Sequence, residues 1–82
     1  MARGLRNWKF KEHCEFLSKH GFKLISIKGS HYFYWRKDEK EKEFLVQAIQ
    51  SENPQTLKTM KMSVKHSGIP KSKYFKFSTK DA

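Results

Sequence analysis

The residues best suited to chemistry in this sequence are Lys28, Gly29, Ser30 and His31, which stand in a row between two apolar runs. A glycine and one further residue between two strand-like runs predict a two-residue hairpin turn, because glycine accepts the positive φ of a type II′ turn. With this loop length, Lys28 and His31 face each other across an antiparallel pair. The turn therefore puts a fixed positive charge beside the side-chain type whose proton moves near neutral pH.

This combination fits the cleavage of RNA without a metal ion. The reaction needs a base for the 2′-hydroxyl proton, an acid for the leaving oxygen and positive charge for the transition state. His31 can serve as base or acid and Lys28 can supply the charge, while the backbone of Gly29 and Ser30 can approach a phosphate closely. Judged by residue types alone, a histidine after Gly-Ser is more often a plain turn residue.

The other three histidines are expected to be structural. His13 borders the apolar seam of the first predicted helix, and His20 and His66 stand near helix ends, where a protonated histidine favourably meets the helix dipole. No histidine has the spacing to cysteine or acidic residues that zinc sites require, so we expect no metal and no other cofactor. Motifs of nucleotide and serine hydrolases are also absent from the sequence.

The charge of the chain points to a polyanionic partner. The 82 residues carry a net charge of +10, with seven basic residues against two acids in residues 1–30 and seven lysines against Asp81 in residues 54–82. Nucleic acid is the natural partner for such an excess. We expect the RNA backbone to bind the turn residues Lys28, Gly29 and Ser30 together with a lysine stripe on the second predicted helix. That stripe consists of Lys58, Lys61 and Lys65.

Length and composition fit one small intracellular domain over 1–82, with a core over about 8–70 and a basic tail over 71–82. The single cysteine, Cys14, excludes an internal disulfide and favours a reducing compartment. No apolar run approaches the ~20 residues that a membrane helix needs. We therefore expect a soluble, cytoplasmic protein with no membrane partner.

The elements around the turn predict an α+β fold. Apolar periodicity indicates helices over 8–19, capped by Asn7, and over about 56–67, and strands over 22–28, 31–37 and 44–49. Gly21 and Gly68, each followed by an apolar residue, are typical helix stops. This order gives a two-layer sandwich, a three-stranded antiparallel sheet with both helices on one face, which is the layout of double-stranded-RNA-binding domains. For the tail the sequence leaves a short helix, an edge strand and a flexible segment open.

Both faces of the first hairpin are apolar, so periodicity alone does not decide which face is buried. Pairing across the turn matches Ile27 with Tyr32, Ile25 with Tyr34 and Leu24 with Trp35. Tyrosines tolerate water at their hydroxyl ends, whereas aliphatic side chains, Phe and Trp suit a face covered by helices. We therefore expect an inward set of Phe22, Leu24, Phe33 and Trp35. In the third strand, Phe44, Val46 and Ala48 are expected to point inward.

Together these motifs resemble the HicA family of bacterial toxin ribonucleases, also called YcfA-like. The family pattern has a helix ending in Gly-Phe, a strand, Lys-Gly-Ser-His, an aromatic or aliphatic strand, a third strand and a helix ending in Gly-Ile. The resemblance covers roughly residues 8–70. The matching segments are Gly21-Phe22, Lys28-Gly29-Ser30-His31, Tyr32-Phe33-Tyr34, Phe44-Leu45-Val46 and Gly68-Ile69.

The resemblance implies a double-stranded-RNA-binding-like fold and a metal-independent mRNA endonuclease, with His31 as general acid/base. It also implies a toxin–antitoxin pair, in which a HicB-like antitoxin binds the toxin and masks its site. Where relatives often carry Pro-Val-His at the end of the third strand, this chain has Gln47, Ala48 and Ile49. Two alternatives stay open, a non-catalytic basic RNA-binding module and a domain whose basic face meets an acidic protein.

Overall fold

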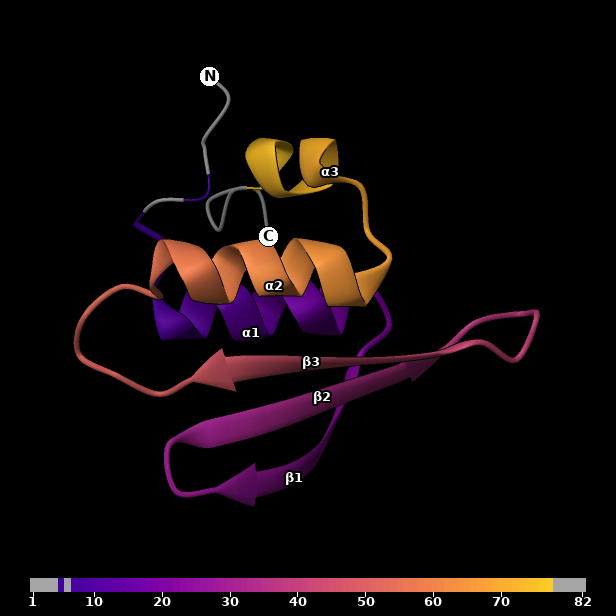
Figure 1. Cartoon of the computed structure of the whole chain (residues 1–82), viewed down its shortest axis with the longest axis horizontal. Coiled ribbons are helices and arrows are strands. Elements are labelled where there is room, and N and C mark those ends of the chain that lie inside the picture. The colour runs from indigo at the N-terminus through magenta and orange to yellow at the C-terminus, as the bar shows by residue number, and fades with distance from the viewer. Residues whose placement is uncertain (1–4, 6, 78–82) are drawn as a thin grey trace.

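The computed structural model shows a helical layer on one face of a three-stranded sheet (Figure 1). It describes Leu5 and residues 7–77. The elements follow in the order α1 (Phe10–Lys19), β1 (Lys23–Lys28), β2 (His31–Lys37), β3 (Glu43–Ile49), α2 (Leu57–Ser67) and α3 (Lys71–Lys76). The sheet is antiparallel with the strand order β1-β2-β3. The predicted α+β class and element order are confirmed, and α3 is added to them.

Helix α1 begins two residues later than predicted. Its N-cap residue is Lys9 rather than Asn7, and the Lys9 backbone N–H donates to the Glu12 carboxylate at 3.0 Å. An acidic side chain in the first turn thus satisfies a backbone donor that the helix leaves unpaired. The helix ends as expected, because the Phe22 N–H donates to the Leu17 carbonyl at 3.0 Å and the Phe22 side chain is buried.

Helix α2 is capped at both ends, and the glycine stop at its C-terminus was predicted. The Thr56 hydroxyl accepts a hydrogen bond from the Thr59 N–H at 3.1 Å at its start. At its end Gly68 adopts a left-handed conformation with φ of 73°, and Ile69 folds back into the core. A Cβ on Gly68 would collide with the Phe44 ring, so space as well as conformation demands glycine here.

The first hairpin keeps the predicted register only beside its turn, where the pairs are Lys28 with His31 and Ile27 with Tyr32. Further along β1 the register shifts by one residue between Leu24 and Ser26, which makes Ile25 a bulge. Leu24, rather than Ile25, therefore lies opposite Tyr34. The bulge thus shifts the residues of β1 that precede it, Lys23 and Leu24, by one position relative to β2.

The predicted inward set is wrong for two of its four residues, since Phe33 and Trp35 lie on the sheet face that the helices leave open. Phe22 is buried as predicted. Leu24 lies opposite Tyr34 on the helix side, but on the edge strand β1 it stays 44% exposed. The tyrosines point toward the helices instead. Tyr34 is only 7% exposed, and the Tyr32 ring meets the Phe10 ring edge-on at a centroid distance of 4.8 Å.

Polar groups lie near the hydroxyl ends of both tyrosines. The Tyr34 hydroxyl lies close to the Cys14 thiol of α1, and at the surface the Tyr32 hydroxyl donates to the Gln50 side chain at 3.5 Å. A buried hydroxyl costs little when it has such a partner. In β3 the prediction is confirmed, since Val46 and Ala48 are buried and Phe44 packs against the core.

Helix α3 makes part of the basic tail a core element. The Tyr74 side chain is fully buried, with its ring 4.1 Å from the Phe16 ring and 5.7 Å from the Trp8 ring between centroids. The core thus reaches beyond residue 70, and residues 71–76 form the short helix among the three alternatives. Residues 78–82 lie outside the described part of the chain. Within residues 7–77, no helix has the length and apolar character needed to cross a membrane.

Candidate active site

The hairpin turn holds Lys28, Gly29, Ser30 and His31 together. Gly29 has a φ of 60° and Ser30 does not have a positive φ, which is the φ pattern of a type II′ turn. The Ser30 carbonyl accepts a hydrogen bond from the Gln50 N–H at 2.7 Å, and this bond ties the turn to the end of β3. A Cβ on Gly29 would meet nothing within 4 Å, so the turn backbone is open to a ligand.

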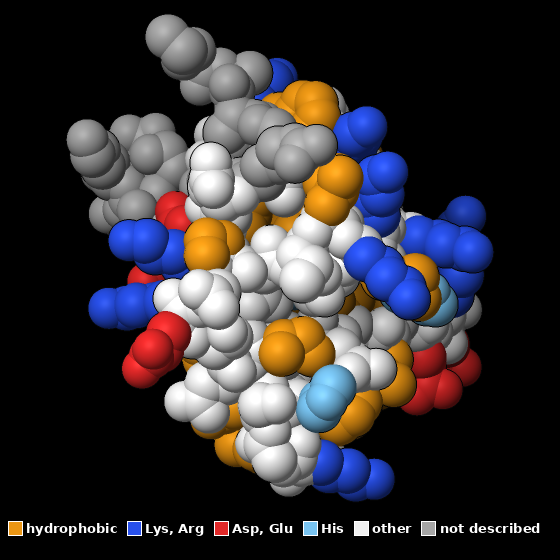
Figure 2. Space-filling view, turned by 60° about the vertical axis from the view of Figure 1, so that its left-hand side comes forward, with side chains coloured by type: hydrophobic (Ala, Val, Ile, Leu, Met, Phe, Trp, Pro, Cys, Tyr) orange, Lys and Arg blue, Asp and Glu red, His pale blue; other side chains and the backbone are white. Residues whose placement is uncertain are grey.

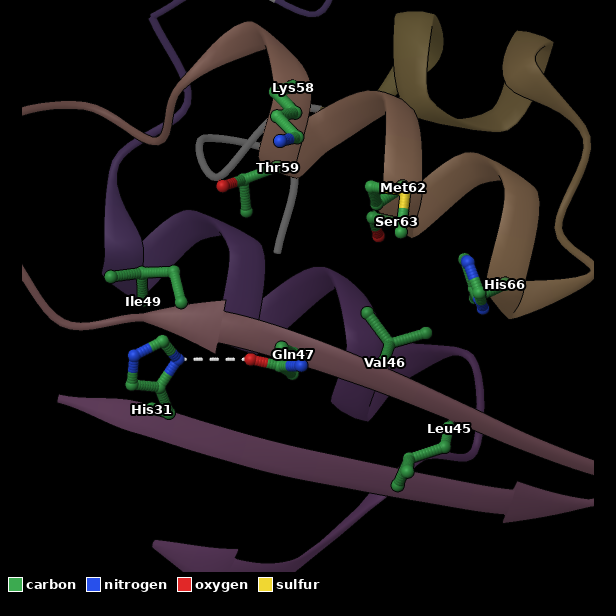
Figure 3. A pocket seen from close by; sticks show the side chains of 10 residues that line it. All are labelled: His31, Leu45, Val46, Gln47, Ile49, Lys58, Thr59, Met62, Ser63 and His66. Atoms are coloured by element: carbon green, nitrogen blue, oxygen red, sulfur yellow. Dashed lines mark hydrogen bonds between the residues drawn. The ribbon is translucent and has the colours of Figure 1, made fainter. Parts of the chain in front are cut away.

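His31 lies exposed at the start of β2 and has one hydrogen-bond partner among the described side chains. Its Nδ1 lies 3.0 Å from Oε1 of Gln47, which reaches across from β3 (Figure 3). Because an amide oxygen only accepts, Nδ1 carries the proton and donates it to Gln47. In the neutral ring Nε2 is then the nitrogen without a proton, and none of the hydrogen bonds among the described residues involves it. The exposed nitrogen has the lone pair that a general base needs.

The register of β2 and β3 places Ile49 directly opposite His31. This is the position at which the HicA pattern often has its second histidine. Gln47, two residues earlier on the same face, binds the His31 ring instead. The site therefore has an uncharged positioning residue beside its histidine and an aliphatic side chain where a second proton-transfer group could stand.

A groove of about 600 Å³ runs between β3 and α2 and includes His31 at one end (Figure 3). Lys58 and Thr59 project from α2 above that end. The lining residues are His31, Leu45, Val46, Gln47, Ile49, Lys58, Thr59, Met62, Ser63 and His66. His66 is exposed and lies at the opposite end of the groove, so the two histidines do not form a pair.

The predicted RNA-binding lysines are all exposed, but only part of the set gathers at His31. Lys28 lies opposite His31 in the hairpin, and Lys58 lines the same groove. Lys61 and Lys65 are on α2 but not among the groove-lining residues. In Figure 2 basic side chains, lysine and arginine together, are most dense along one flank of the surface, and a histidine ring is exposed among mainly hydrophobic and neutral groups.

Comparisons with protein-family models, with curated proteins and with solved structures found no match for this chain.

Two of the remaining histidines have structural roles, as predicted. His13 is fully buried between the Gln55 side chain at 3.3 Å and the Ser63 hydroxyl at 2.9 Å. Burial lowers the pKa of His13 to about 4, against a smaller opposing effect of the Gln55 hydrogen bond. Nδ1 of His20 lies 2.9 Å from the Phe16 carbonyl and donates to it, one turn earlier in α1.

Other reactive groups of the described chain are not arranged for chemistry. Burial raises the pKa of the Cys14 thiol, which keeps it protonated and poorly nucleophilic. Among the residues that the structure describes, no group of three or more His, Cys, Asp or Glu lies close enough to hold a metal ion.

Sequence reasoning missed Gln47, the residue that orients the candidate base. The alternation of β3, with Val46 and Ala48 inward, predicts that Gln47 points outward. The predicted inward set, however, puts His31 on the other face, and only the structure shows both side chains on the open face. Whether the His31 and Gln47 side chains come into contact depends on the register of β2 against β3, and the sequence does not specify that register.

Proposed function

We propose that this protein is a metal-independent endoribonuclease that cleaves mRNA, with His31 as general acid/base. The observation that carries the proposal is the hydrogen bond from His31 Nδ1 to Gln47, which leaves Nε2 as the basic nitrogen of the neutral ring, on an exposed residue beside Lys28 and an open glycine turn. Turn, base and positive charge come from one hairpin, so their relative positions do not depend on a flexible loop.

In the proposed reaction, Nε2 of His31 takes the proton from a 2′-hydroxyl, and that oxygen attacks the adjacent phosphorus. The new O2′–P bond replaces the P–O5′ bond, giving a 2′,3′-cyclic phosphate and a 5′-hydroxyl end. The leaving 5′-oxygen takes its proton from the imidazolium of His31 or from water. Lys28 stabilises the negative charge of the transition state, since it pairs with His31 across the hairpin.

The lysines Lys28, Lys58, Lys61 and Lys65 bind the RNA backbone in this proposal. All four are exposed and two of them flank His31. The resemblance to HicA supports a role as the toxin of a toxin–antitoxin pair, neutralised by a HicB-like antitoxin. Its place of action is the cytoplasm, where mRNA is found and a lone cysteine stays reduced.

Cleavage of a labelled mRNA in EDTA by the wild-type protein and by His31→Ala tests the proposal. The wild type cleaves and leaves 2′,3′-cyclic phosphate ends, whereas the variant is slower by about 10²- to 10⁴-fold, the usual contribution of a general acid/base. His66→Ala is the matched control, because His66 is also exposed but lies at the far end of the groove.

Equal cleavage by the wild type and His31→Ala contradicts the catalytic role of His31. Absence of cleavage by both proteins, together with RNA binding that weakens with salt, favours the non-catalytic RNA-binding module. The antitoxin part is tested separately, by asking whether a HicB-like protein encoded beside this gene relieves growth arrest and forms a stable complex with this chain.

A further inference from the structure

Two aromatic side chains on the sheet are not used by the core. Phe33 and Trp35 follow His31 at every second position of β2 and lie with it on the face opposite the helices. Both are half-buried, and neither packs against the core cluster. Helices α1, α2 and α3 all lie on the other side of the sheet (Figure 1). These rings therefore form part of an open surface that continues directly from the candidate base.

The three side chains form a row with regular spacing. Alternate residues of a strand are about 6.8 Å apart, so His31, Phe33 and Trp35 succeed one another at roughly that interval. Neighbours on the same face hold the row in place. Gln47 pairs with Phe33 across the strands while binding His31, and the Trp35 indole N–H donates to the Glu43 carboxylate at 2.9 Å.

Positive charge borders this row on β1. Lys28 lies opposite His31 and Lys23 lies opposite Trp35, and both lysines are exposed. Glu43 is the acidic side chain of this face in the described strands, and it is hydrogen-bonded to Trp35 at the end distant from His31. A surface with aromatic rings along its centre and lysines along its border matches the bases and phosphates of a nucleic-acid strand.

We propose that this open face is a stacking platform for unpaired bases, which makes single-stranded RNA the substrate class of the His31 site. Bases beside the scissile phosphate stack on Phe33 and Trp35, and Lys23 and Lys28 contact their phosphates. The placement of the scissile phosphate at His31 rests on the proposed ribonuclease function. Aromatic rings accept any base by its flat face, but a duplex keeps those faces covered by neighbouring base pairs.

Binding without cleavage tests the platform, with His31→Ala as the parent protein. An unstructured RNA oligonucleotide is compared with the same strand annealed to its complement. Tryptophan fluorescence reports stacking directly, because Trp35 is partly exposed and the only other tryptophan, Trp8, is fully buried. We expect the single strand to quench Trp35 fluorescence and to bind more tightly than the duplex.

Substitutions then assign the effect to the rings. In the same parent, Phe33→Ala and Trp35→Ala are each expected to weaken single-strand binding by about 5- to 150-fold, the range for loss of one base–aromatic stack. Phe33→Tyr and Trp35→Phe keep a ring and retain most of the affinity. Ile27→Ala removes an exposed apolar side chain that lies opposite Tyr32 on the other face of the sheet, so it controls for loss of apolar area and should leave binding unchanged. Thermal unfolding confirms that each variant is folded.

Equal affinity for single strand and duplex, absence of quenching, or unchanged binding by folded Phe33→Ala and Trp35→Ala overturns the platform. These outcomes are independent of catalysis. If the wild type cleaves RNA while the alanine variants bind normally, only the platform is wrong. If stacking is observed and the wild type does not cleave, the platform stands and the ribonuclease function fails.

Discussion

At His31, one hydrogen bond determines which ring nitrogen can act as a base. The Gln47 amide oxygen fixes the proton on Nδ1 and directs Nε2 outward. In catalytic triads a carboxylate orients the histidine and also stabilises its protonated form. An amide orients the ring but carries no charge, so in the proposed reaction Gln47 does not stabilise the imidazolium in the way a carboxylate does.

Replacing Gln47 tests its role as a positioning residue. Gln47→Ala removes the acceptor for Nδ1–H, and we expect kcat to fall about 3- to 10-fold, as for one hydrogen bond, with little change in KM. Gln47→Glu should move the acidic limb of the pH–rate profile to higher pH, because a carboxylate favours the protonated ring. A pH profile of Gln47→Glu that matches the wild type excludes this role, since a merely structural residue would not move it.

The hairpin turn could be predicted from residue types because its conformation is decided locally. Gly29 takes the positive φ of the turn, and this alone puts Lys28 opposite His31. The contact between His31 and Gln47 joins residues 16 positions apart. It depends on how β3 is aligned against β2, which no local pattern of the sequence determines.

At the scale of the elements, Arg36 shows how the structure buries a sheet face that carries a charge. Arg36 follows Tyr32 and Tyr34 at every second position of β2, so its side chain is on the same face of the sheet. When the helices cover this face, the Arg36 guanidinium becomes partly buried. The structure meets that requirement by placing Arg36 over the Phe22 and Phe44 rings, 5.4 and 4.5 Å from their centroids. Cation–π contact of this kind offsets the loss of water around the charge. Such compensation is visible only after the elements are packed.

Helix α3 provides a prediction at this scale. Tyr74→Ala should lower the free energy of unfolding by about 3–5 kcal/mol, because the ring fills the space between Trp8 and Phe16. Urea denaturation followed by circular dichroism measures the loss. Lys73→Ala, an exposed change in the same helix, should stay within about 0.5 kcal/mol of the wild type. A small effect of Tyr74→Ala would mean that α3 is not part of the core.

At the scale of the whole molecule, a buried chain of hydrogen bonds joins the three helices to the segment before α2. Gln55 receives the Ile49 N–H at 2.9 Å, so its oxygen is an acceptor and His13 Nδ1 must donate to it. His13 Nε2 then accepts from Ser63, whose oxygen lies 2.7 Å from the Tyr74 hydroxyl. The remaining step joins Tyr74 to Ser67 at 3.0 Å. The bond in which Nε2 accepts from Ser63 requires a neutral His13, because a protonated Nε2 has no lone pair.

The sequence placed His13 beside the seam of a helix, but it could not supply partners that are 42 and 50 positions away. The fold class could be predicted because it needs only the order and apolar faces of the elements. The buried hydrogen-bond network depends on how the helices and strands finally pack, so it cannot be predicted from the periodicity of apolar residues.

The buried His13 makes the stability of the whole domain depend on pH. Its pKa is about 4 in the folded protein and 6.5 ordinarily, so the unfolded chain binds the proton first as pH falls. The contribution of neutral His13 to the free energy of unfolding is fully present above pH 6.5 and decreases as the pH falls to 4. About 2 kcal/mol of it is lost between pH 7 and pH 5. Urea denaturation at these two pH values measures the loss. His13→Gln, which cannot titrate, should be less stable at pH 7 yet lack this part of the pH dependence. An equal slope in both proteins would show that His13 takes up a proton as readily in the folded state as in the unfolded chain.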